Sequence, residues 1–151
     1  MRKVKKNQIT IISLLSVTFI LLSVIFILKL SAADYNLSKT SWKLISWDSS
    51  FVSNYPLQNS TITAQFNDNV LTGSSGCNQY IASYEINDTQ LMVNASISSR
   101  KLCSEVLMLQ ESNYLDAIQN AQSYEINSDN DLKISYKSEE NYGVMTFLSQ
   151  N

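Results

Sequence analysis

The stretch GSSGCNQYIASY, residues 73–84, contains the end of one predicted strand, a turn and most of the next strand. Residues 76–78 (Gly-Cys-Asn) interrupt the extended pattern, because glycine and asparagine favour turns. After this break Tyr80, Ala82 and Tyr84 alternate with polar residues, which predicts a strand over residues 79–86 with one buried face. The chain is therefore expected to contain short strands joined by polar turns.

The same alternation recurs along the chain on both sides of this stretch. Strands are predicted at residues 41–47, 61–66, 70–74, 79–86, 90–93, 123–126, 132–136 and 144–148. Residues 48–59 are expected to form a loop, because Pro56 cannot lie in a central strand. Short polar connections between consecutive strands favour antiparallel pairing.

The period changes from two to 3.6 residues after residue 104, which predicts one helix over residues 105–121 with Ser104 as its N-cap. The apolar stripe of this helix consists of Leu107, Met108, Tyr114, Leu115, Ile118 and Ala121. Together with the strands, this helix predicts an α+β domain in which a strongly curved antiparallel sheet packs against one helix.

The first 33 residues differ in composition from the rest. Four basic residues precede residue 7, and no charge occurs from Ile9 to Leu28. A helix of that length spans about 30 Å, the thickness of the membrane interior. Residues 1–33 are predicted to be a transmembrane anchor with its basic end in the cytoplasm. A signal segment cleaved after Ala33 is the alternative.

Residues 34–40 are then a short linker, and residues 41–151 form one domain outside the cytoplasm. Residues 34–151 carry 6 Lys and Arg against 13 Asp and Glu, a net charge of −7. This charge disfavours nucleic acid as a partner. The chain has no histidine, so the commonest general base and metal ligand are both absent. No catalytic, metal or cofactor residue is predicted, and the protein is not expected to be an enzyme.

Residues 73–84 resemble the signature of the META domain family, which includes the HslJ-like heat-shock proteins. In that signature a Gly-Cys-Asn run is followed by two tyrosines. Arg100-Lys101-Leu102-Cys103 stands in the place of the family's Thr-x-x-Ala-Cys segment, and the resemblance extends over about residues 41–148. The matching positions are Trp42, Gly76, Cys77, Asn78, Tyr80, Tyr84, Cys103 and Glu111. Ala82 departs from the pattern, since the family usually has a glycine there.

The resemblance implies a cracked-barrel-like sheet with one helix, an envelope location and a link to heat shock or other stress. It does not imply a reaction. Cys77 and Cys103, the only cysteines, both lie on motif positions. In an oxidising compartment they are expected to form a disulfide bond.

The expected function is that of a membrane-tethered, extracytoplasmic and non-enzymatic protein, periplasmic or at the cell surface. It would support envelope integrity or stress tolerance by binding an envelope protein. One alternative is a carrier of an apolar ligand or lipid inside a barrel-like cavity, and the other is a hydrolase.

Glu111 falls within the apolar stripe of the predicted helix, where an unpaired carboxylate would be costly. It is expected to accept hydrogen bonds from backbone N–H groups of residues 76–78, or to pair with Arg100 or Lys101. The alternative is a catalytic acid or base with a raised pKa.

Overall fold

The computed structural model describes residues 37–50, 52–139 and 141–150, all within one compact unit, Asn36–Asn151. The predicted anchor, residues 1–33 with its span from Ile9 to Leu28, lies outside the described residues. Among the residues that are described, no helix has both the length and the apolar character needed to cross a membrane.

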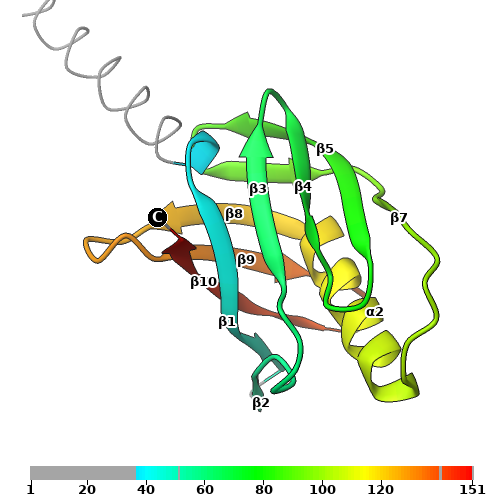
Figure 1. The fold of residues 1–151 in the computed structure, drawn as a ribbon. Helices are drawn as coiled ribbons and strands as arrows, with labels where there is room; N and C mark the ends of the chain where they lie inside the picture. The colour runs from blue at the N-terminus through cyan, green and yellow to red at the C-terminus, as the bar shows by residue number, and fades with distance from the viewer. Residues whose placement is uncertain (1–36, 51, 140, 151) are drawn as a thin grey trace, which may run out of the picture. The chain divides into compact units, whose positions relative to one another are not determined.

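The fold is an antiparallel β-barrel with the helix α2 (Glu105–Gln119) at its end (Figure 1). The strands of the described residues are β1 (Ser41–Ser49), β2 (Val52–Asn54), β3 (Thr63–Asn67), β4 (Val70–Ser74), β5 (Gln79–Asn87), β6 (Gln90–Val93), β7 (Ile97–Ser98), β8 (Ala121–Ile126), β9 (Leu132–Lys137) and β10 (Tyr142–Gln150). The helix follows β7.

The barrel is closed, which corrects the expectation of a cracked sheet. The strand order β10-β9-β8-β6-β5-β4-β3-β1 returns to its start because β10 also pairs with β1. This pairing runs from Ser41↔Gln150 to Trp47↔Met145. β10 ends at Gln150, two residues after the predicted end, and these two residues extend the pairing with β1. β2 pairs with β1, and β7 pairs with β5.

Alternating residues of the strands point inward and fill the barrel. The largest fully buried side chains include Trp42, Phe66, Tyr114 and Phe147. α2 contributes Tyr114, Ala117 and Ile118 to this core. The exclusion of these side chains from water supplies the main driving force for folding.

The helix differs from its prediction at its C-terminal end and in its stripe. Asn120 ends α2, since its side chain donates to the Asp116 carbonyl at 2.9 Å. Ala121 is buried as expected, but it belongs to β8. Met108 is 39 % exposed, whereas Gln110 is buried. At the other end Ser104 is the N-cap, but its side chain makes no capping hydrogen bond.

Two short strands and one strand start were not predicted. β2 lies in the predicted loop 48–59, and β7 has only two residues. Neither piece is long enough to show an alternating pattern. Gly143 precedes the predicted strand of residues 144–148 but lies in β10, where a Cβ atom would stand 1.7 Å from the Asp48 carbonyl oxygen. A glycine inside a strand often marks such a close backbone approach.

Leu37 belongs to the predicted linker 34–40, yet it is fully buried. Its carbonyl accepts a hydrogen bond from Trp42 Nε1 at 3.3 Å. The packed domain therefore begins at or before Leu37.

Candidate functional site

Glu111 and Asn78 form the centre of a polar cluster that joins α2 to the break between β4 and β5. Glu111 Oε2 accepts from the Asn78 backbone N–H at 2.8 Å and from Ser75 Oγ at 2.5 Å. Glu111 Oε1 accepts from Asn78 Nδ2 at 2.9 Å. The predicted backbone donor is confirmed at Asn78. No ion pair joins Glu111 to Arg100 or Lys101, all three of which the structure describes.

Asn78 also fixes the loop that precedes α2. Its Oδ1 accepts from the Lys101 backbone N–H at 2.7 Å and from Ser99 Oγ at 2.8 Å. Next to it, Cys77 and Cys103 form a disulfide bond with a Cα–Cα distance of 6.1 Å. The predicted disulfide is confirmed, and the loop is held by a covalent bond and by the buried Asn78 side chain.

Gln110 performs a matching role that the sequence reasoning missed. Its Oε1 accepts from the Leu57 backbone N–H at 2.7 Å, and its Nε2 donates to Ser60 Oγ at 2.6 Å. These bonds hold the segment before β3 against α2. Helical spacing could have predicted this role, because residue 110 lies three positions after Leu107 and four before Tyr114, on the buried face of the helix.

Gly76 lies between these two sets of contacts and has a φ of +102°. A Cβ atom there would lie 2.6 Å from Ser60 Oγ and 2.8 Å from Gln110 Nε2. Only glycine combines this backbone conformation with so close an approach.

The aromatic motif residues are part of the core. Tyr80 and Tyr114 share a hydrogen bond inside the barrel, and burial raises the pKa of both hydroxyls. Tyr84 packs edge-on against Phe66 with ring centroids 5.1 Å apart. Trp42 is 1 % exposed. These positions maintain the fold and offer no access to a ligand from solvent.

All buried side-chain polar atoms in the described part of the chain have a hydrogen-bond partner. The Glu111 cluster is thus a satisfied structural network. It positions the loop and the first turns of α2, and its carboxylate oxygens already accept three hydrogen bonds.

Three exposed apolar residues lie in the loop before α2 and in the first turns of the helix. Leu102 is 89 % exposed, and Val106 and Leu109 are each 61 % exposed. We call these three residues the α2 surface. Arg100 and Lys101 precede it and are exposed; neither forms an ion pair within the described residues. In Figure 1 the first turns of α2 lie at the lower end of the barrel, and β1 starts at the opposite end.

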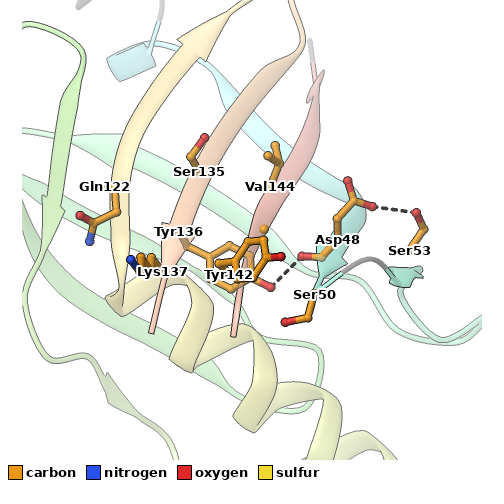
Figure 2. A pocket seen from close by; sticks show the side chains of 10 residues that line it. Asp48, Ser50, Ser53, Gln122, Ser135, Tyr136, Lys137, Tyr142 and Val144 are labelled. Atoms are coloured by element: carbon orange, nitrogen blue, oxygen red, sulfur yellow. Dashed lines mark hydrogen bonds between the residues drawn. The ribbon is translucent and has the colours of Figure 1, made fainter. Parts of the chain in front are cut away.

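A second feature is an open groove of about 850 Å³ at the ends of β1, β8, β9 and β10 (Figure 2). Its lining comprises Asp48, Ser50, Ser53, Gln122, Ser135, Tyr136, Lys137, Tyr142, Gly143 and Val144. None of these residues was predicted as functional, because the groove brings together segments far apart in the sequence.

Residues 35–151 match the family model described as the META domain. Among solved structures, an NMR structure of a protein from Burkholderia xenovorans shares 21 % identity, with a TM-score of 0.63 over 76 % of this chain and 84 % of that one. Another NMR structure shares 15 % identity, with a TM-score of 0.55 over 74 % and 92 % of the two chains. A crystal structure of a duf4847 family protein from Bacteroides vulgatus shares 12 % identity, with a TM-score of 0.52 over 76 % and 96 %.

These three likenesses concern the fold alone. No curated protein matches the chain.

Proposed function

Since the chain belongs to the META domain family, we propose that it is a non-enzymatic, membrane-tethered envelope protein that acts by binding another protein. The observation that carries the proposal is the α2 surface. Exposed apolar patches bordered by polar residues mark interaction sites on soluble domains. Here the patch lies on the first turns of α2 and on the loop before it, and the Glu111 cluster and the disulfide fix the position of both.

The charges beside the α2 surface indicate the chemistry of the partner. Arg100 and Lys101 are adjacent in sequence, and Glu105 is the nearest acidic residue along the chain. This segment therefore has a net positive charge, although residues 34–151 as a whole have a net charge of −7. A partner segment with apolar side chains flanked by carboxylates would complement it.

A tether at residues 9–28 would keep the domain close to the membrane, because the predicted linker of residues 34–40 is short. The Cys77–Cys103 bond supports an oxidising compartment outside the cytoplasm. Cleavage after Ala33 would release the same domain.

The absence of an enzymatic role is also part of the proposal. The chain has no histidine, and Glu111, the one carboxylate predicted within the apolar stripe, is occupied by Ser75 and Asn78. Its hydrogen bonds stabilise the break between β4 and β5, which favours a structural role for Glu111 over a catalytic role in a hydrolase.

The carrier of an apolar ligand remains the second candidate. It requires a continuous apolar cavity inside the barrel. The inward-facing side chains Trp42, Phe66 and Phe147 are bulky and no more than 1 % exposed, which favours a binding surface on the outside.

A triple variant tests the proposed surface. Leu102→Ser, Val106→Ser and Leu109→Ser together remove its apolar character. A control variant with Met92→Ser and Leu148→Ser changes exposed apolar residues of β6 and β10 instead. Wild type and control should capture the same envelope protein in pull-downs from stressed cells and restore stress tolerance to a deletion strain. The triple variant should do neither. Full complementation by the triple variant would refute the proposal.

The tether needs a separate test. Reporter fusions after residue 151 should be active with a reporter that works only outside the cytoplasm. Activity of a cytoplasmic-type reporter at the same position would reverse the proposed topology.

A further inference from the structure

The groove of Figure 2 has a mostly apolar surface with a few polar groups of both signs set into it. It contains one carboxylate, that of Asp48, and one ammonium group, that of Lys137. Serine hydroxyls, the Gln122 amide and the ring of Tyr142 make up much of the rest. A ligand with a large net charge would find no excess of opposite charge here.

Several of these groups have unused hydrogen-bonding capacity. The side chains of Ser50, Ser135 and Lys137 make no hydrogen bond within the described residues. Asp48 Oδ1 accepts from Ser53 Oγ at 2.8 Å, which leaves the second carboxylate oxygen available. Gln122 Nε2 donates to the Asn120 carbonyl at 3.2 Å, and its amide oxygen is available to accept. Donors and acceptors are therefore interspersed along one groove.

An aromatic ring provides the apolar part of the lining. Tyr142 is 48 % exposed, and Figure 2 shows its ring in the centre of the groove, between Lys137 and Asp48. Aromatic rings bind ligands that are apolar on one face and polar at the edge, because the ring face is apolar and the surrounding groups are hydrated.

Hydrogen bonds to backbone carbonyl groups fix the base of the groove. The Tyr136 hydroxyl donates to the Asp48 carbonyl at 2.7 Å, and the Ser50 N–H donates to the Tyr142 carbonyl at 3.0 Å. Gly143 permits the end of β1 to lie directly on β10. The groove is therefore held in shape before any ligand arrives, which lowers the entropic cost of binding.

We propose that this groove binds a sugar unit of a neutral glycan. A sugar ring has an apolar C–H face that can lie on the Tyr142 ring. Its hydroxyl groups can accept from the Lys137 ammonium group and donate to the available oxygens of Asp48 and Gln122. A phosphate would need more cations than the single Lys137, and an acyl chain would make no use of the polar groups of Asp48, Lys137 and Gln122. The proposal is independent of the α2 surface, which shares no residue with the groove.

The test uses the full chain in a zwitterionic detergent that has no sugar headgroup. The probes are an array of immobilised neutral oligosaccharides of glucose, galactose, mannose and N-acetylglucosamine, with sulfated and phosphorylated glycans beside them. Wild type should bind at least one neutral oligosaccharide and prefer it to the anionic glycans. The affinity for that oligosaccharide is then measured in solution by isothermal titration calorimetry.

Two groove variants and one control locate the binding. Tyr142→Ala and Gln122→Ala should each weaken the affinity by about tenfold or more, equivalent to about 1.4 kcal/mol. Tyr55→Ala, which removes a tyrosine that is 71 % exposed outside the groove, should leave it unchanged. Circular dichroism shows whether each variant is folded. If Tyr142→Ala does not fold, the affinity of Gln122→Ala alone tests the proposal. The proposal is overturned if no neutral oligosaccharide binds, if anionic glycans bind better, or if Gln122→Ala binds as wild type does.

Discussion

The hydroxyl groups of Tyr80 and Tyr114 lie 2.7 Å apart inside the barrel, where α2 meets β5. The Tyr80 hydroxyl also donates to the Thr63 carbonyl at 3.0 Å. Because Tyr80 has a single proton to donate, Tyr114 must be the donor in the bond between the two hydroxyls. A directed chain of hydrogen bonds therefore runs from α2 through β5 to β3.

This direction predicts unequal effects for two similar substitutions. Tyr114→Phe removes one hydrogen bond but leaves the bond from Tyr80 to Thr63, so it should lower the free energy of unfolding by about 1 kcal/mol. Tyr80→Phe removes the acceptor of a fully buried donor, and its effect should be about 2–3 kcal/mol. Urea denaturation measures both values.

The double variant provides the control. Tyr80→Phe with Tyr114→Phe leaves no unpaired Tyr114 hydroxyl, so its effect should be smaller than the sum of the single effects. Equal effects of the two single substitutions would show that the chain does not run in the inferred direction.

The same two residues predict how stability depends on alkaline pH. Burial is the main cause that raises the pKa of Tyr80 and Tyr114. In the unfolded chain both ionise near pH 10. The contribution of the two tyrosines to the free energy of unfolding is therefore complete below about pH 10. It is lost as the pH rises towards their pKa values in the folded state, by about 1.4 kcal/mol per pH unit for each tyrosine.

Denaturation at a series of pH values above 10 measures this slope. The double phenylalanine variant should show a shallower slope than wild type, because it lacks the two groups. If both proteins lost stability equally between pH 10 and the alkaline unfolding transition, the buried tyrosines would not be the cause.

The prediction of strand bounds succeeded where turn residues flank a strand. β4 (Val70–Ser74) and β6 (Gln90–Val93) have the predicted bounds, because turn residues with positive φ, Asp68, Asn69 and Asp88, stand at the hairpins beside them. Closure of the barrel was not predictable in this way. It depends on Ser41 pairing with Gln150, a contact across the whole domain that no local pattern records.

The candidate site was predictable to the same limited extent. Glu111 was identified because a carboxylate within an apolar stripe requires partners, and Asn78 was among the expected donors. The groove was not identified, because Asp48, Gln122 and Tyr142 are ordinary surface residues in the sequence. Only the closed barrel brings them together.

Glu111→Ala should lower the free energy of unfolding by about 1–3 kcal/mol, because Ser75 Oγ and the Asn78 donors lose their acceptor. Glu111→Gln keeps one carbonyl oxygen and should cost less. Thermal and urea denaturation of both variants provide the comparison. Glu105→Ala, which removes an exposed carboxylate from the first turn of the same helix, is the matched control. A Glu111→Ala variant as stable as this control would contradict the structural role of the cluster.

The disulfide and Asn78 hold the same loop, and this predicts how the loop responds to reduction. The bond closes a loop of 26 residues, and its loss should lower the free energy of unfolding by about 3.5 kcal/mol in the chain-entropy model. Cys77→Ser with Cys103→Ser should still fold, because Asn78 retains its bonds to Lys101 and Ser99.

Adding Asn78→Ala to that double variant should then release the loop. Amide exchange at Leu102 should become faster than in the double variant or in Asn78→Ala alone. Asn78→Ala alone should change that exchange less, because the disulfide remains. Equal exchange in the oxidised Asn78→Ala protein and the triple variant would show that the disulfide does not restrain the loop.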